Sequence, residues 1–150
     1  MSGGVKRFFV DTDVLLYSLD PADPAKQRMA RHWMKLLWHN EAGRISWQVV
    51  NEFYSNAIRK LHREPAGLRA EVQSLALWEP VGFGLGVIER AWHWMDKAGL
   101  PYWDGLILSS AETAGCNCLL SEDFQPGQRF DGITVVDPFR QRPEDFGLPE

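Results

Sequence analysis

Short runs of continuous apolar residues alternate along this chain with longer segments of helical periodicity, and this alternation strongly constrains the fold. The runs RFFV, RIS, CNCLLS and ITVVD are expected to be strands, at 7–10, 44–46, 116–121 and 133–137, with a further short strand near 79–83. Helices are expected at 14–20, 24–40, 47–62, 67–78, 86–99 and 103–115. Buried strands separated by amphipathic helices are typical of a parallel sheet covered on both faces. The sequence therefore predicts an α/β protein, a three-layer α/β/α sandwich around a central parallel sheet.

The length of the chain suits one domain, because 150 residues can bury a substantial core without disulfides or metals. No linker, repeat or low-complexity segment divides it, so we expect a single domain over residues 1–150. No apolar run approaches the roughly 18 residues needed to cross a bilayer. The first residues, MSGGVKRFF, lack the apolar stretch and cleavage site of a signal peptide. We therefore expect a cytoplasmic protein without a membrane span.

The charge and the cysteines argue against two classes of protein, a basic nucleic-acid-binding domain and a zinc-binding protein. A net charge of −4 disfavours a domain whose affinity for nucleic acid rests on overall basicity. It leaves room for a nucleic-acid enzyme that recruits phosphate through divalent cations held by carboxylates. Cys116 and Cys118 have no histidine partners at zinc-site spacing, and residues two apart on a strand are poorly placed to bridge each other. We expect both to be reduced structural residues.

Four acidic residues have unusual positions on this map. Asp11 directly follows the first expected strand, and Asp123 follows the strand at 116–121. In open α/β sheets, ligands bind beyond the carboxyl ends of the strands, which is where both residues are expected. Glu52 borders the apolar face of its helix, and Asp104 lies on the same helical stripe as Ile107. A carboxylate at the edge of a core-facing stripe is costly unless something pairs with it.

Each acid also has an ordinary structural interpretation. Asp13 suits the N-cap of a helix that starts at Val14, and Asp104 suits the first turn of its helix. Taken together, however, the acids lie at strand ends or interrupt apolar faces, and no Lys or Arg accompanies them in sequence. Carboxylates that gather without cations repel one another, and a hard divalent cation relieves this. Oxygen-only ligands favour Mg²⁺ or Mn²⁺.

Four stretches of the sequence resemble the PIN-domain nucleases, and more closely the VapC-like toxins of bacterial toxin–antitoxin pairs. These are FFVDTDVLLYSLD, ISWQVVNEFY, LPYWDGLILSSAETAGCNCLLSEDFQPGQ and ITVVDPF, in the order of the family. The third stretch is specific, because it joins two acids to their characteristic flanks. The resemblance implies an α/β/α sandwich and a metal-dependent endoribonuclease that acts on RNA, often tRNA. It also implies a cognate antitoxin and a homodimer, with the early helices at both interfaces.

The resemblance implies roles for individual residues. Four would be the acids that bind Mg²⁺ or Mn²⁺ and carry catalysis: Asp11, Glu52, Asp104 and Asp123. Four more would support them: Asp13 as a polar group, Thr12 and Ser46 as hydroxyls, and Glu122 as a competitor of Asp123. The flank in SED favours Asp123 as the metal-side acid. Trp103, beside Asp104, is the tryptophan we would test for base stacking.

Two other functions remain open from the residues. The run DTDVL also fits haloacid-dehalogenase-like phosphatases, in which Asp11 would be the nucleophile and Asp13 the acid/base. That mechanism needs a later Lys or Arg to hold the phosphoryl group, and it gives Glu52 and Asp104 no role. The second alternative is a non-catalytic PIN-like binding module, which would have no reason to keep all four acids.

Overall fold

A five-stranded sheet forms the centre of the computed structural model, which describes residues 6–150. Its strands are β1 (Phe8–Val10), β2 (Gly43–Arg44), β3 (Cys118–Leu120), β4 (Arg129–Phe130) and β5 (Ile133–Val136). Their order in the sheet is β2-β1-β3-β5-β4. All neighbours pair in parallel except β4, which pairs with β5 antiparallel. The predicted parallel sheet is confirmed, with one antiparallel strand added at its edge.

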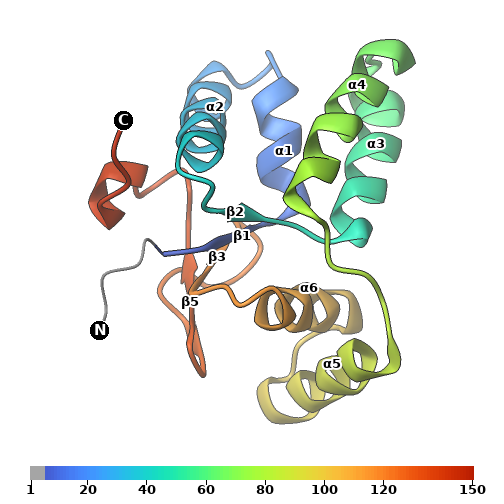
Figure 1. Ribbon diagram of the computed structural model, residues 1–150, viewed down its shortest axis with the longest axis vertical. Coiled ribbons are helices and arrows are strands. Elements are labelled where there is room, and N and C mark those ends of the chain that lie inside the picture. The colour runs from blue at the N-terminus through green and yellow to red at the C-terminus, as the bar shows by residue number, and fades with distance from the viewer. Residues whose placement is uncertain (1–5) are drawn as a thin grey trace.

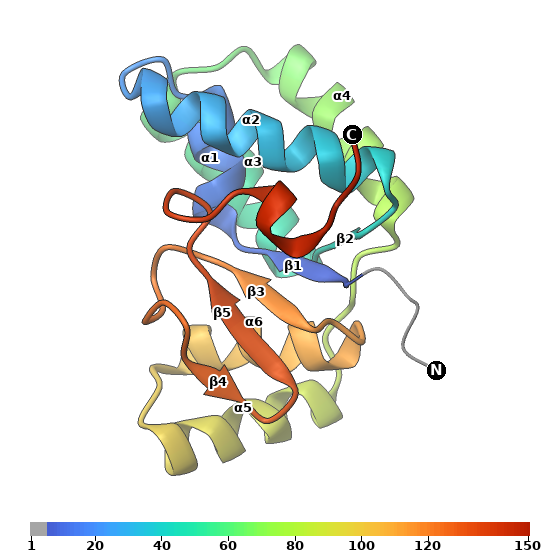
Figure 2. The same cartoon turned by 90° about the vertical axis from the view of Figure 1, so that its left-hand side faces the viewer.

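Helices cover both faces of this sheet (Figure 1). One face carries α1 (Thr12–Leu19), α2 (Pro24–His39), α3 (Trp47–Leu61) and α4 (Pro65–Leu75), which continues into the 3-10 turn η1 (Ala76–Trp78). The other face carries α5 (Leu85–Ala98) and α6 (Tyr102–Thr113). A last 3-10 turn, η2 (Pro143–Phe146), lies beside α2 (Figure 2). The three-layer α/β/α architecture is thus the one that the sequence predicts.

The first strand is the centre of the core. Phe8, Phe9 and Val10 are completely buried, because β1 has neighbours on both edges and helices on both faces. Trp33 of α2 packs on Phe8 with ring centroids 5.4 Å apart, and its indole N–H donates to the Pro138 carbonyl at 3.0 Å. This hydrogen bond allows a tryptophan to be fully buried without an unpaired donor. The packing fixes β1 and so the position of the acid that follows it.

Several local predictions need correction. Helix α1 begins at Thr12, and its N-cap is Asp11, whose side chain accepts from the Thr12 N–H; Asp13, the predicted cap, lies in the first turn. The strand expected near 79–83 is a single bridge between Ser46 and Val81. The hairpin of β4 and β5 was not predicted, although Asp131 and Gly132 form the two-residue connection typical of hairpins.

The two cysteines lie at the start of β3. Strand β3 begins at Cys118, so Cys116 precedes it, and both residues are buried free thiols. Burial raises the pKa of the Cys116 thiol to about 12, which keeps it protonated and unreactive. Within residues 6–150, no helix combines the length and the apolar character needed to cross a membrane.

Candidate active site

An acidic cleft of about 230 Å³ opens beyond the carboxyl ends of β1 and β3. Five acids line it, from the end of β1, the first turn of α1, the middle of α3, the first turn of α6 and the loop after β3: Asp11, Asp13, Glu52, Asp104 and Asp123. Crossovers of the parallel sheet bring these segments to one edge, although the first and the last of them lie more than 100 residues apart in sequence. The four predicted acids therefore meet in one cleft, joined by Asp13.

Asp11 is held by hydrogen bonds to both of its oxygens. Its Oδ1 accepts from the Thr12 N–H at 2.8 Å, and its Oδ2 accepts from the Ser121 hydroxyl at 2.7 Å. The same Ser121 Oγ accepts from the Asp123 N–H at 3.0 Å, so one buried hydroxyl orients two acids. Burial raises the pKa of Asp11 to about 6, and the charges of Asp123 and Glu52 add to it, while the two hydrogen bonds lower it.

Asp13 is the acid of the cleft with the highest pKa. Its Oδ2 accepts from the Glu122 N–H at 3.2 Å, whereas its Oδ1 is buried and has no hydrogen-bond partner within the described residues. Burial raises the pKa of Asp13 to about 8, with further increases from the charges of Asp11 and Asp123. One carboxylate oxygen from each of Asp11, Asp13 and Asp123 lies within 4.8 Å of the others.

Glu52 and Asp104 lie on the walls, outside this group of three. The Thr12 hydroxyl donates to Glu52 Oε1 at 3.1 Å, which links the start of α1 to α3. Asp104 is half-buried, and burial followed by the charge of Asp123 raises the pKa of its carboxyl. Thr12 thus contacts one of the predicted acids, and its supporting role stays a prediction.

Glu122 and Ser46 are engaged elsewhere. Glu122 forms an ion pair with Lys26 of α2, whose ammonium group lies 4.6 Å from the Tyr17 ring centroid. Because Glu122 already has a cation and does not line the cleft, the geometry favours Asp123 as the metal-side acid. Ser46 is the buried N-cap of α3, where its Oγ accepts from the Val49 N–H at 3.2 Å. It does not line the cleft either.

Sequence reasoning missed several residues of the site. Ser121 stands between a buried strand and Asp123 in LLSED, and this position was the available signal. Gln48 and Asn56 line the cleft from α3, at helical spacing around Glu52. Lys26 is 96 residues from Glu122 in sequence, and no local sequence pattern predicts their ion pair.

The cleft fits a hard divalent cation. Among the described residues that line it, none is Lys, Arg, His or Cys, so the charged donors are all carboxylate oxygens. Two buried side-chain oxygens of these residues, Asp13 Oδ1 and Gln48 Oε1, have no partner within residues 6–150. Mutual repulsion and unpaired oxygens are both relieved by a cation that prefers oxygen ligands, such as Mg²⁺ or Mn²⁺. The donor set therefore agrees with the predicted cofactor.

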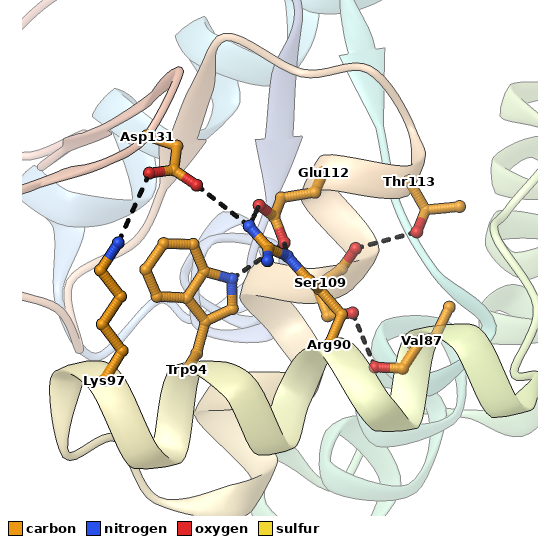
Figure 3. A network of polar contacts seen from close by, with 8 residues as sticks. All are labelled: Val87, Arg90, Trp94, Lys97, Ser109, Glu112, Thr113 and Asp131. Atoms are coloured by element: carbon orange, nitrogen blue, oxygen red, sulfur yellow. Dashed lines mark hydrogen bonds and ion pairs between the residues drawn. The ribbon is translucent and has the colours of Figure 1, made fainter.

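The opposite end of α6 holds a different polar cluster (Figure 3). Arg90 of α5 donates to both carboxylate oxygens of Glu112 at 3.0 Å, and also to Asp131 Oδ2 at 3.0 Å. The Trp94 indole N–H donates to the same Glu112 at 2.9 Å. This charge-neutralised cluster fastens α6 to α5 and to the β4–β5 turn, and so holds the helix that carries Asp104.

Comparison with known proteins relates the chain to one family. The family model described as "PIN domain" matches residues 8–129. No curated protein gives a significant match. The similar solved structures include a toxin–antitoxin complex from Klebsiella pneumoniae, with 19% identity, a TM-score of 0.59, and 87% of this chain and 96% of that chain covered.

Two further structures share the fold at comparable distance. Mycobacterium tuberculosis VapC20, described as a sarcin-ricin loop cleaving toxin, has 20% identity and a TM-score of 0.54, with 77% of this chain and 89% of that chain covered. Rickettsia felis VapBC2, bound to a DNA fragment from its promoter, has 13% identity and a TM-score of 0.56, with 85% and 96% covered. At these identities the structures share a fold with this protein. The family model extends over most of the sequence, from β1 to β4, and the chain belongs to the PIN domain family.

Proposed function

We propose that this protein is an endoribonuclease that uses Mg²⁺ or Mn²⁺ to hydrolyse RNA phosphodiester bonds, as the toxin of a toxin–antitoxin pair. The observation that carries the proposal is the convergence of Asp11, Asp13 and Asp123 within 4.8 Å, with no cation among the described residues that line the cleft. Membership of the PIN domain family supports it.

Four acids would hold the metal: Asp11, Glu52, Asp104 and Asp123. A bound divalent ion supplies an activated water at neutral pH and neutralises the charge that develops on the phosphate. Asp11 offers an oriented carboxylate, because Ser121 and the Thr12 N–H fix both of its oxygens. Asp13, with one unpartnered oxygen, is the supporting acid.

Residues around these acids keep the geometry fixed. Ser121 links the carboxylate of Asp11 to the backbone N–H of Asp123. Thr12 fixes one oxygen of Glu52. Such second contacts orient metal ligands and typically change metal affinity or activity by about 10–100-fold when removed.

The contacts of the cleft favour a nuclease over a phosphatase that uses Asp11 as nucleophile. Both Asp11 oxygens already accept hydrogen bonds, from Thr12 and Ser121. The Lys or Arg that would hold a phosphoryl group is missing from the described residues of the cleft. A non-catalytic module would gain nothing from the burial and the neighbouring charges that raise the pKa of Asp13 to about 8.

The partner proposal rests on the similar structures and on a second cleft. The similar structures include a toxin–antitoxin complex and VapBC2. Helices α1–α4 and η1 border a cleft of about 760 Å³ whose floor includes the buried Phe53. Its charged lining residues are Arg31, Lys35 and Arg63 against one acid, Glu71. We propose that an apolar, acidic segment of the antitoxin docks there. A homodimer and a cytoplasmic location remain predictions.

The proposal is tested with Asp11→Asn and Asp104→Asn, and with Glu122→Gln as the matched control outside the cleft. Each Asn variant keeps the shape of the side chain and removes one charge. We expect Mn²⁺-dependent cleavage of total cellular RNA by antitoxin-free protein to fall by roughly 100-fold or more in both. We expect Glu122→Gln to keep activity within about tenfold. Full activity in either Asn variant, or metal-independent cleavage by the wild type, would contradict the proposed site.

A further inference from the structure

Trp103 stands at the mouth of the acidic cleft with most of its indole in water. It lies in the first turn of α6, lines the cleft beside Asp104, and is 62% exposed. Residues 6–150 contain six exposed large hydrophobic side chains, and Trp103 is the one among them that lines this cleft. An indole left in water forgoes stabilisation in proportion to its apolar area. Within residues 6–150, this aromatic face is therefore accessible to a ligand that enters the cleft.

Trp103 and Asp104 are adjacent in sequence, but their side chains point in different directions. Successive residues of an α-helix diverge by about 100°, so Asp104 and Trp103 point in different directions from the same turn. Asp104 is half-buried, whereas Trp103 is exposed. The Tyr102 ring contacts the Trp103 ring at a centroid distance of 5.4 Å and an interplanar angle of 59°. Tyr102 itself packs with the α5–α6 cluster, so this tilted contact joins the indole to the body of the fold.

The wall of the cleft that α3 forms bears an amide side chain, with a cation next to it. Asn56 of α3 lines the cleft, and its Oδ1 accepts from the exposed Arg59 at 2.6 Å. Along this helix, Glu52, Asn56 and Arg59 follow one another at near-helical spacing, from acid to amide to cation. A ligand that spans the cleft therefore meets carboxylates at the base, an aromatic face at one wall and a cation beyond the other. A strand of nucleic acid has matching groups, a base for the indole and successive phosphates for the bound metal and for Arg59.

We propose that Trp103 stacks on an unpaired base next to the phosphate that is cleaved, so that the site selects single-stranded RNA and prefers a purine at that position. The inference rests on the proposed nuclease function and adds a specificity-determining residue to it. Stacking on one aromatic side chain tolerates any base, and it is stronger for the larger purine ring. The base must leave a duplex to reach the indole, which disfavours paired substrates.

Binding and cleavage are measured separately. The probes are fluorescein-labelled 12-residue oligoadenylate and oligouridylate, with Ca²⁺ in place of Mn²⁺ during binding. The variants are Trp103→Leu, which keeps an apolar side chain without a ring, and Trp103→Phe, which restores a smaller ring. The control is Trp92→Leu, since Trp92 is 50% exposed on α5 and does not line the cleft. Sedimentation velocity of each variant reports whether Trp103 contributes to an interface between copies.

We expect Trp103→Leu to weaken oligoadenylate binding roughly tenfold and to reduce the preference for oligoadenylate over oligouridylate. We expect Trp103→Phe to lie between Trp103→Leu and the wild type, and Trp92→Leu to bind like the wild type. Unchanged binding by Trp103→Leu, or a loss that accompanies dissociation of a dimer, would overturn the stacking role, and an equal loss for both probes would overturn the purine preference. In those cases Mn²⁺-dependent cleavage by the wild type would still support the nuclease. A wild type that neither binds nor cleaves RNA would overturn both proposals.

Discussion

The two ends of α6 gather carboxylates in opposite ways. At its first turn, Asp104 faces Asp11, Asp13 and Asp123 across a cleft whose described lining contains no cation. At its last turn, Glu112 accepts two hydrogen bonds from Arg90, at 3.0 Å each (Figure 3). The same helix therefore has one end in an unneutralised acidic cluster and the other in a neutralised one.

The pKa shifts express this difference. In the cleft, burial and neighbouring charges raise the pKa of Asp13 to about 8, and they also raise that of Asp104. At the other end, the hydrogen bonds that Arg90 donates to Glu112 raise the pKa of Arg90, so each partner stabilises the charged form of the other. Charged clusters built for stability contain both signs, whereas the cleft bears repulsion that a proton or a bound cation relieves. The contrast separates a structural cluster from a candidate metal site on physical grounds.

The largest stability effect is expected at the neutralised end. Arg90→Met should leave Glu112 with only the Trp94 N–H and should lower the free energy of unfolding by about 1–3 kcal/mol. That range is discounted for the 39% exposure of the Arg90 side chain. Urea unfolding measures it, and added Mn²⁺ should not change the difference from the wild type.

Lys97→Met is the matched control for Arg90→Met. Lys97 lies 3.9 Å from Asp131 and is 58% exposed, so its loss should cost at most about 0.5 kcal/mol. If the two variants were equally destabilised, the cluster around Glu112 would have no special role in fastening α6.

A smaller effect is expected from pH at the unneutralised end. The pKa of Asp13 is about 8 and that of Asp11 about 6 in the folded protein, against an ordinary value of 3.8. The folded state therefore keeps protons that the unfolded chain releases, and stability should fall as pH rises from about 4 to 8. Without metal, we expect the Tm to drop by roughly 3–8 °C between pH 5 and pH 8.5.

Asp13→Asn should flatten this pH dependence, because it removes the most perturbed carboxyl. Asp96→Asn, at an exposed position of α5, should leave the dependence as in the wild type. Differential scanning calorimetry in EDTA makes the comparison. A Tm that is constant or rises over this range in the wild type would show that the cleft does not store the repulsion described.

The layers of the fold could be predicted because their signal is local. Strands β1, β3 and β5 are short apolar runs, and each long helix shows its apolar spacing in one window. Strand β4 escaped prediction because only Arg129 and Phe130 form it, too few for a periodic pattern. Asp13 was assigned the cap of α1 because an Asp before an apolar run suits both positions. The identity of the N-cap depends on the backbone at Asp11, which sequence does not show.

The acids of the site were predictable individually, whereas their contacts were not. Asp11 and Asp123 could be found because strand ends converge in a parallel sheet. The hydroxyl of Ser121 joins Asp11 across 110 residues, and Lys26 neutralises Glu122 across 96. Such pairs depend on which segments the crossovers bring together. Tertiary geometry therefore adds to the SED flank a physical difference between Asp123, which lines the cleft, and Glu122, which pairs with Lys26.

That distinction also provides the most direct test of a metal site in the cleft. Isothermal titration calorimetry would measure Mn²⁺ binding to antitoxin-free wild type at pH 7.5, to Asp123→Asn and to Glu122→Gln. We expect saturable binding by the wild type, weakening of at least about 10-fold in Asp123→Asn, and near wild-type affinity in Glu122→Gln. Absence of Mn²⁺ binding in the wild type, or equal affinity in Asp123→Asn, would contradict the account.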